Sequence, residues 1–207
     1  MAEIRTSAQG ALSDTDPERT RHALHATIKA CSRMQRSVDT LLLLARLESG
    51  QHVLAPDPLD LVSLLQDVLT AFKEMSAPKN ARNIRAHLPD AAWVQSDQGV
   101  IERIVSNLLR NAIEYSPQDD DIELRLERQA QSWTLCITNT APDLQASDLD
   151  QFGLRFWRKD TGGGTAHHAG LGLALAMALA REIDLPLEFF LDQGRLTARL
   201  GPWAALV

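Results

Sequence analysis

The sequence predicts an α+β protein, in which an N-terminal helical hairpin precedes a two-layer α/β sandwich. Three observations support this prediction. Residues 17–49 carry apolar side chains at uninterrupted helical spacing, residues 61–115 contain two further helical patterns around short strand patterns, and residues 122–137 and 187–200 contain paired alternating runs. Helices interspersed with antiparallel strand pairs are typical of a two-layer domain.

Composition and charge exclude several classes of protein. With 207 residues, 44% of them hydrophobic, the chain has enough apolar side chains for a core. A formal net charge of −6 argues against nucleic-acid binding. Cys31 and Cys136 lie far apart and indicate neither a disulfide framework nor a zinc site, so a reducing cytosol is expected. The most apolar runs, 40–45 and 170–180, fall short of the ~20 residues that span a bilayer, so no direct membrane contact is expected.

A long helix is predicted from Pro17 to Ser49. Its apolar residues follow the near-heptad spacing of a helix that packs against a partner helix: Leu24, Ile28, Cys31, Met34, Val38, Leu41 and Ala45. Residues 2–12 favour a preceding helix and residues 13–17 a turn, which together predict a helical hairpin. Two hairpins from two chains would close a four-helix bundle, so we expect a homodimer.

A domain boundary is predicted after this hairpin, dividing the chain into residues 1–54 and 55–207. Gly50 is a suitable helix C-cap, and Pro56-Asp57-Pro58 is interpreted as a linker. Three helices are then predicted, over Leu61–Phe72, Ile101–Tyr115 and Gly170–Ile183. Six strands are predicted, at Asn83–Leu88, Ala92–Gln95, Ile122–Leu126, Trp133–Ile137, Leu187–Leu191 and Arg195–Leu200.

Asn107 and Asn111 are the first candidate site. Asparagines four residues apart project from one helical face, one turn above the other. Such a pair can coordinate a hard cation through carbonyl oxygen and donate N–H groups to phosphate, as a Mg-nucleotide requires. The alternative is that both merely lie on a solvated helix face.

Gly170 and Gly172, at the start of the third predicted helix, are the second candidate. Glycines let backbone come close to phosphate, and the N–H groups at a helix N-terminus favour anions. The alternative is a glycine-containing turn that enters a core helix. A P-loop is excluded because no Gly-Lys-Ser or Gly-Lys-Thr follows.

Five stretches, in order along nearly the whole chain, resemble motifs of sensor histidine kinases, whose ATP domain shares a superfamily with gyrase, Hsp90 and MutL. They are Glu3-Ile4-Arg5-Thr6 (an H box without its histidine), residues 41–50 (the end of the dimerisation helix), 107–117 (the N box), 149–158 (the F box) and 170–176 (the second glycine box). The resemblance implies a dimerisation and phosphotransfer hairpin in residues 1–54 and a Bergerat-type ATP-binding domain in residues 55–207.

The same resemblance implies the ligands ATP and Mg. Its nucleotide-binding residues would be Asn107, Arg110, Asn111, Tyr115, Asn139, Ala141, Gly170, Leu171, Gly172 and Leu173, with Asn111 as the metal ligand and Tyr115 beside the adenine. Residues 160–169 would form a mobile lid. Glu3 would orient or deprotonate the phosphoacceptor histidine, and Thr6 would position water for dephosphorylation of a response regulator. Phe152 is interpreted as an ordinary core aromatic.

Several residues depart from the family pattern. The first glycine box normally has an Asp followed by Gly-x-Gly, and this chain has Asn139, Ala141 and Asp143. A neutral acceptor at Asn139 is weaker than a carboxylate. Glu114 stands where a basic residue is common, and it repels phosphate unless it points outward. We therefore expect a nucleotide dissociation constant of order 10⁻⁵ to 10⁻³ M.

The phosphoacceptor histidine of the family should immediately precede Glu3, where this chain has Ala2. We therefore expect no autophosphorylation, whether the histidine was replaced or the sequence begins just after it. His22 and His25 lack the Glu-x-x-Thr context and are interpreted as solvated helix residues.

The leading hypothesis is the catalytic core of a sensor histidine kinase, which autophosphorylates a histidine and passes the phosphoryl group to an aspartate of a response regulator. The family implies a cytoplasmic fragment of a protein anchored in the bacterial inner membrane. The alternative is a degenerate, non-catalytic module that binds the regulator. A stand-alone serine kinase or anti-sigma factor would leave the hairpin without a role.

Overall fold

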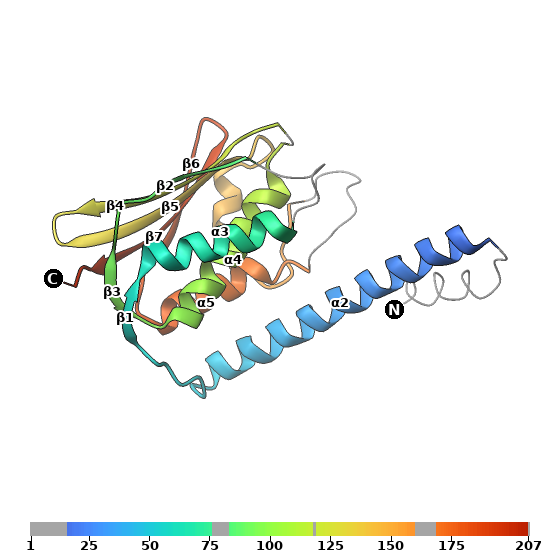
Figure 1. Ribbon diagram of the computed structural model, residues 1–207, viewed down its shortest axis with the longest axis horizontal. Helices are drawn as coiled ribbons and strands as arrows, with labels where there is room; N and C mark the ends of the chain where they lie inside the picture. Colours follow the sequence, from blue (N-terminus) through green and yellow to red (C-terminus); the bar gives the residue numbers. More distant parts are fainter. Residues whose placement is uncertain (1–15, 76–82, 118, 160–168, 207) are drawn as a thin grey trace.

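The computed structural model describes residues 16–75, 83–117, 119–159 and 169–206 (Figure 1). Two of the predictions lie outside these residues: the first helix of the hairpin with Glu3 and Thr6, and nearly all of the lid. None of the described helices is long and apolar enough to cross a membrane.

Helix α2 (Pro17–Glu48) projects from the body of the molecule as one long rod (Figure 1). Asp16 caps its start by accepting a hydrogen bond from the N–H of Glu18, and a proline occupies the first turn, where its missing N–H costs nothing. Gly50 follows the helix with a φ of +64°, the left-handed conformation that glycine adopts without strain. The predicted helix is therefore confirmed at both ends.

Most of the remaining elements form two layers (Figure 1). One layer is a five-stranded sheet of order β2-β4-β5-β7-β6: Ile84–His87, Ile122–Gln129, Ser132–Thr140, Arg195–Ala204 and Leu187–Asp192. The other layer contains α3 (Leu61–Met75), α4 (Gln98–Tyr115) and α5 (Gly172–Glu182). Strands β4 and β5 are antiparallel, as are β6 and β7, which confirms both predicted hairpins. Strand β2 joins the edge of the sheet in parallel to β4.

The Pro56-Asp57-Pro58 segment was predicted to be a linker, and this is wrong. It enters strand β1 (Asp57–Asp60), which pairs antiparallel with β3 (Trp93–Ser96) in a small second sheet. Leu59 opposes Val94, and both are buried. Proline cannot donate to a strand ladder but is tolerated at a strand start and at an edge. Although the two prolines resemble a linker in the sequence, they are compatible with a strand that is paired on one side only.

The core lies between the large sheet and the helices. Side chains that are under 2% exposed come from both layers: Ile101, Ile104 and Leu109 of α4, Leu179 of α5, and Ile122, Leu124, Leu135, Ile137 and Leu200 of the sheet. Asp97 fixes the start of α4 by accepting hydrogen bonds from the N–H groups of Val100 (3.0 Å) and Ala55 (2.9 Å). Burial alone would raise the pKa of Asp97, but these hydrogen bonds outweigh it and the pKa is lowered.

Helix α2 also contributes to this core. Leu44 and Leu47, from its last two turns, are 3% and 8% exposed and join the same buried cluster as α4 and α5. An ion pair between Glu48 and Arg155 adds a contact from the end of α2 to the loop after β5 and η2 (Ala146–Gln151). The C-terminal half of the long helix is thus docked on the sandwich.

One residue of the predicted apolar stripe of α2, Leu41, also contacts the core of the sandwich. Leu41 is half-buried and packs against the core, whereas Leu42 is 56% exposed. The exposed stripe therefore runs through Leu24, Ile28, Val38 and Leu42, of which Ile28 is 61% exposed. Docking of α2 on the sandwich decides which of the two leucines is covered.

Candidate nucleotide site

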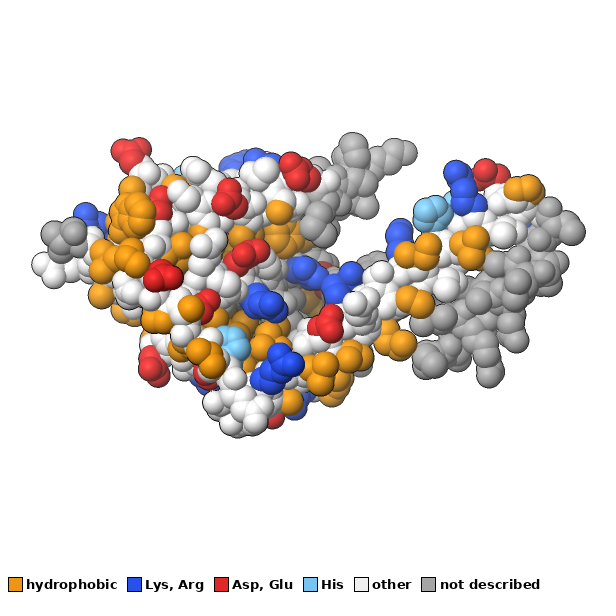
Figure 2. Space-filling model, turned by 60° about the horizontal axis from the view of Figure 1, so that its bottom comes forward, with side chains coloured by type: hydrophobic (Ala, Val, Ile, Leu, Met, Phe, Trp, Pro, Cys, Tyr) orange, Lys and Arg blue, Asp and Glu red, His pale blue; other side chains and the backbone are white. Residues whose placement is uncertain are grey.

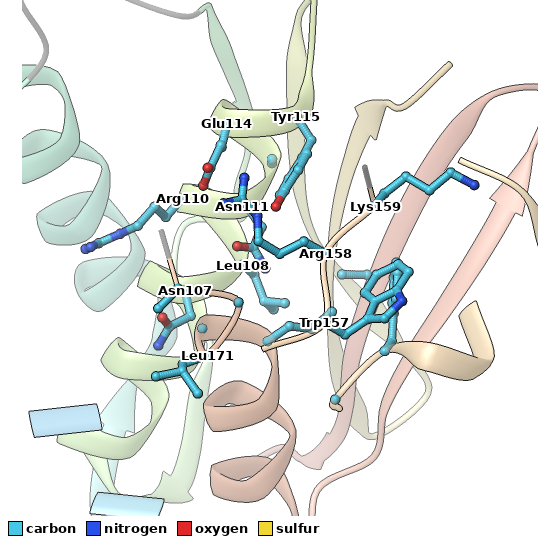
Figure 3. A pocket seen from close by; sticks show the side chains of 18 of the residues that line it. Asn107, Leu108, Arg110, Asn111, Glu114, Tyr115, Trp157, Arg158, Lys159 and Leu171 are labelled. Atoms are coloured by element: carbon cyan, nitrogen blue, oxygen red, sulfur yellow. The ribbon is translucent and has the colours of Figure 1, made fainter. Parts of the chain in front are cut away.

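A cavity of about 490 Å³ lies between α4, α5, strand β5, the loop of residues 152–159 and helix α2. This volume is within the usual range for a small-ligand pocket. All ten residues predicted to bind nucleotide line it: Asn107, Arg110, Asn111, Tyr115, Asn139, Ala141, Gly170, Leu171, Gly172 and Leu173. The structure therefore brings together residues from three elements that are well separated in sequence. Figure 3 shows the labelled side chains around this cavity.

The two asparagines of α4 converge on the start of α5. A Cβ atom placed on Gly172 would lie 3.0 Å from Oδ1 of Asn107 and 3.8 Å from Oδ1 of Asn111. Nδ2 of Asn107 donates to the carbonyl oxygen of Arg103 (2.8 Å), which orients the amide. Both carboxamide oxygens are thus directed at the same glycine, as residues one helical turn apart allow.

The start of α5 is suited to an anion. Its N-cap position is held by Leu171, whose side chain is buried and cannot cap the helix. The first N–H groups of a helix have no partner within the helix, and the helix dipole concentrates positive charge there. Because Gly172 has no side chain, these N–H groups face the cavity and the two asparagines without obstruction.

Gly170 is required for a different reason. Its φ is +69°, and a Cβ atom there would lie 2.8 Å from both the carbonyl carbon of Phe156 and the carbonyl oxygen of Trp157. The N–H of Phe156 also donates to the carbonyl oxygen of Gly170 (3.0 Å). This glycine therefore lets the F-box loop and the segment before α5 lie backbone against backbone, which shapes one wall of the cavity.

Replacing Gly170 with alanine should lower the free energy of unfolding by about 2–3 kcal/mol, because alanine meets both an unfavourable φ and two backbone atoms. Urea unfolding measures this change. The matched control is Gly99→Ala in α4, where the new Cβ atom meets only ordinary contact at 3.5 Å. That variant should be more stable by about 0.5 kcal/mol. Equal stability of the two variants would contradict the close packing of residue 170.

Strand β5 supplies the opposite end of the cavity. Asn139 is 4% exposed and lies on the same strand face as Ile137, toward the helices. Its Nδ2 donates to the carbonyl oxygen of Thr140 (3.0 Å), so its Oδ1 is the atom that can accept from a ligand. The N–H of Ala141 donates to the carbonyl oxygen of Gly194 (2.7 Å), so Ala141 offers the cavity only its methyl group.

Tyr115 lies at the end of α4, and Figure 3 shows its hydroxyl turned toward Arg158. Burial raises the pKa of Tyr115, and the charge of Glu114 raises it further, while the charge and hydrogen bond of Arg158 oppose these effects. The hydroxyl is therefore neutral and accepts from Arg158. Glu114 also lines the cavity.

Three aromatic side chains define an apolar wall. Phe152 packs edge-on against Phe189 at a ring distance of 5.0 Å and contacts Trp157 at 5.7 Å. All three line the cavity. The interpretation of Phe152 as an ordinary core aromatic is therefore incomplete, because its side chain is only half-buried and lines the cavity. Phe156, by contrast, is 60% exposed.

Sequence reasoning did not predict that α2 lines the cavity. Residues Ala30, Arg33, Met34, Arg36, Ser37 and Thr40 do so. A second near-heptad series would have been the signal, since positions 30, 33, 37, 40, 44 and 47 share one face of the helix. The first four residues of this series are small or polar and only the last two are leucine, so the sequence does not show it as an apolar stripe.

The charge of the cavity is positive although that of the whole chain is negative. Among the described residues that line it, five are basic and two are acidic: Arg33, Arg36, Arg110, Arg158 and Lys159 against Glu114 and Asp143. Lys159 is ion-paired with Asp148 at 2.7 Å. A concave basic surface lined by low-dielectric walls concentrates anions.

The oxygen atoms that the cavity offers fit a magnesium ion that is held partly by the protein and partly by the phosphates of a bound nucleotide. Within the described ranges there is no cluster of three His, Cys, Asp or Glu residues that could hold a metal. Mg²⁺ commonly binds through one or two protein oxygens together with substrate phosphates and water. The Oδ1 atom of Asn111 is such an oxygen, so Asn111 is the residue that would hold the ion.

Comparison with known proteins identifies the family. Residues 96–197 match the histidine kinase-, DNA gyrase B- and HSP90-like ATPases. The sensor protein kinase PmrB of Pseudomonas aeruginosa is 28% identical over 175 residues, which cover 84% of this chain and 36% of that protein. The chain carries the catalytic region of a sensor histidine kinase.

Two solved structures share the fold of this kinase region. The Acinetobacter baumannii histidine kinase AdeS superposes with a TM-score of 0.75 at 20% identity, over 97% of this chain and 93% of that one. Full-length ShkA, in complex with AMPPNP, has a TM-score of 0.75 at 18% identity, over 99% of this chain and 43% of that one. At these identities the likeness shows the fold alone. The kinase region spans less than half the length of the curated sensor proteins it matches.

Proposed function

We propose that the cavity binds Mg-ATP and that the chain acts as the catalytic core of a histidine kinase, which transfers the γ-phosphoryl group to a histidine and then to an aspartate of a response regulator. One observation carries this proposal. The carboxamides of Asn107 and Asn111 converge on the uncapped, glycine-opened start of α5 inside a basic cavity. The fold is shared with ShkA, which holds AMPPNP in its structure.

Each end of the nucleotide has a matching part of the cavity. Oδ1 of Asn139 accepts from the adenine amino group, and the apolar wall of three aromatic side chains, together with Ile137, covers the adenine ring. At the other end, the first N–H groups of α5 donate to phosphate oxygens. The side chain of Asn107 orients the phosphates. A bound magnesium ion would neutralise negative charge on the phosphates. Phosphoryl transfer depends on this kind of positioning and neutralisation rather than on a protein nucleophile in the ATP domain.

The proposal includes a homodimer formed through α2. The exposed stripe of Leu24, Ile28, Val38 and Leu42 lies on the face of the helix away from the cavity, and each of these side chains is about half or more exposed. An apolar stripe at heptad spacing is the seam with which helices pair. Glu3, Thr6 and the proposed lid act in this scheme as the family resemblance implies. Because Ala2 and not a histidine precedes Glu3 in this sequence, we expect the 207-residue chain not to autophosphorylate.

Titration calorimetry with Mg-ATP tests the proposal directly. We expect binding with a dissociation constant of order 10⁻⁵ to 10⁻³ M, because Asn139 is a neutral acceptor and Glu114 lines the cavity. Addition of EDTA should weaken the binding of ATP, and GTP, which lacks the adenine amino group, should bind more weakly than ATP. A sub-micromolar constant would contradict the assigned roles of Asn139 and Glu114.

A second candidate is a non-catalytic module that binds a response regulator and retains the fold without the ligand. The neutral Asn139 and the acidic Glu114 in the cavity favour it. Thermal unfolding separates the two, since a ligand at ~100 times its dissociation constant adds ~2.7 kcal/mol of stability. If millimolar Mg-ADP and Mg-ATP leave the melting temperature unchanged, the binding module is the correct description.

A further inference from the structure

Helix α2 presents different faces to the cavity and to solvent. Its cavity face carries Arg33, Ser37 and Thr40 in the same near-heptad series as the buried Leu44 and Leu47. The two leucines set the rotation of the helix, because their burial in the core admits only one orientation. Since a helix rises 1.5 Å per residue, Arg33 stands roughly 16 Å from Leu44 along the helix, above the mouth of the cavity.

Three arginines from two elements gather at that mouth. Arg33 and Arg36 come from α2, and Arg110 comes from α4, where it is the neighbour of Asn111. Burial lowers the pKa of Arg110, the charge of Arg36 lowers it further, and Glu114 opposes both effects. Arg36 and Arg110 are therefore close enough to repel one another. Figure 2 shows Lys and Arg side chains gathered where the long helix meets the body of the molecule.

These guanidinium groups have no carboxylate partner at salt-bridge distance within the described part of the chain. Gathering like charges on a partly covered surface is unfavourable unless an anion joins them. Arginine is the side chain best suited to phosphate, because its planar fork donates two parallel hydrogen bonds. The cluster includes Arg110, the chain neighbour of Asn111, and its other two members come from α2, the helix that packs against α5, so we place it at the phosphate end of the cavity.

We propose that Arg33 and Arg36 of helix α2 bind the outer phosphates of the nucleotide together with Arg110, so that α2 is a part of the ATP site. This inference rests on the proposed function and assigns to the helix a role in discriminating triphosphate from monophosphate. It also couples the position of the helix to nucleotide affinity. Because coupling of two binding equilibria is reciprocal, a signal that displaces α2 weakens ATP binding, and bound ATP holds α2 in place.

The test compares Mg-ATP, Mg-ADP and AMP binding by titration calorimetry in the full 207-residue chain. Arg36→Gln and Arg33→Gln should each weaken Mg-ATP binding about tenfold and change AMP binding less than twofold, since one charge-assisted contact to an outer phosphate is lost. Arg36→Lys should recover part of the affinity. The control is Lys29→Gln, which removes the same charge from an exposed position of α2 that does not line the cavity, and it should leave all three constants within twofold.

Each outcome decides a different question. If the wild-type chain binds ATP and Arg36→Gln binds it equally well, the role of α2 is wrong while the proposed function stands. An equal loss for ATP and AMP also overturns the inference, because it indicates a general effect on the cavity. If the wild-type chain binds none of the three nucleotides, the proposed function itself fails. Unchanged melting temperatures of the unliganded variants establish that folding is unaffected.

Discussion

Asn111→Ala is expected to weaken Mg-ATP binding by about 100-fold, because it removes the proposed metal ligand and one carboxamide from the phosphate end of the cavity. Hydrogen bonds and metal–ligand bonds to charged groups contribute more binding free energy than hydrogen bonds between neutral groups. Asn111 also lies on helix α4, whose position is fixed by its buried face. The side chain is half-buried and does not belong to the buried hydrophobic cluster. The fold should therefore survive.

Calorimetry with ATP in the presence and absence of magnesium measures this effect. Asn111→Asp keeps an oxygen ligand, so it should retain a dependence on magnesium that the alanine variant loses. Asn83→Ala is the matched control, since Asn83 is exposed and its side chain bonds to Asp121, away from the cavity. A magnesium-dependent affinity in Asn111→Ala equal to that of the wild type would remove Asn111 from the site.

The paired substitution Ile28→Glu and Val38→Glu is expected to convert the proposed homodimer into a monomer at micromolar concentration. These side chains are 61% and 49% exposed, so in one chain they contribute little to folding. Burying each in a helical seam contributes about 1.5–3 kcal/mol, and a glutamate in the seam would bring an unpaired charge with it. The dissociation constant of the dimer should therefore rise by at least about 100-fold.

Sedimentation analysis across a range of concentrations gives the oligomeric state. Lys29→Glu changes the charge at an exposed position beside the stripe and should leave the dimer intact. Because the stripe faces away from the cavity, the doubly substituted chain should bind Mg-ATP as the wild type does. A wild-type chain that sediments as a monomer at 100 µM, or a variant that still dimerises, would refute the proposed seam.

The secondary structure was largely predictable because its signals are local. Asp16 and Gly50 mark the ends of α2 through hydrogen bonding and φ preference, which depend on neighbouring residues only. The alternation of Leu124 and Ile137 with polar residues likewise determines a strand pair with one buried face. Strand β1 was missed because its prolines read as a linker, and its partner strand lies more than thirty residues further along the chain.

The candidate site was predictable where one motif supplies several residues on one element. Asn107, Arg110 and Asn111 share a helix, so their spacing and the resemblance to a known motif were enough to nominate them. The reason for Gly170 was not accessible in that way. A Cβ atom at this position would collide with the backbone of residues 156 and 157, and only the fold brings these two segments into contact.

By itself, the amino-acid sequence determined the elements, the family resemblance and the asparagine and glycine motifs, since each depends on residues within a few turns or on short spacing. The tertiary structure alone decided that the motifs share one cavity, that Leu42 rather than Leu41 is exposed, and that Arg33 and Arg36 stand beside Arg110. The physical reason is the burial of Leu44 and Leu47 in the core of the sandwich, which sets the orientation of helix α2. The residues next to Arg33 and Arg36 in the sequence do not indicate that Arg110 lies beside them.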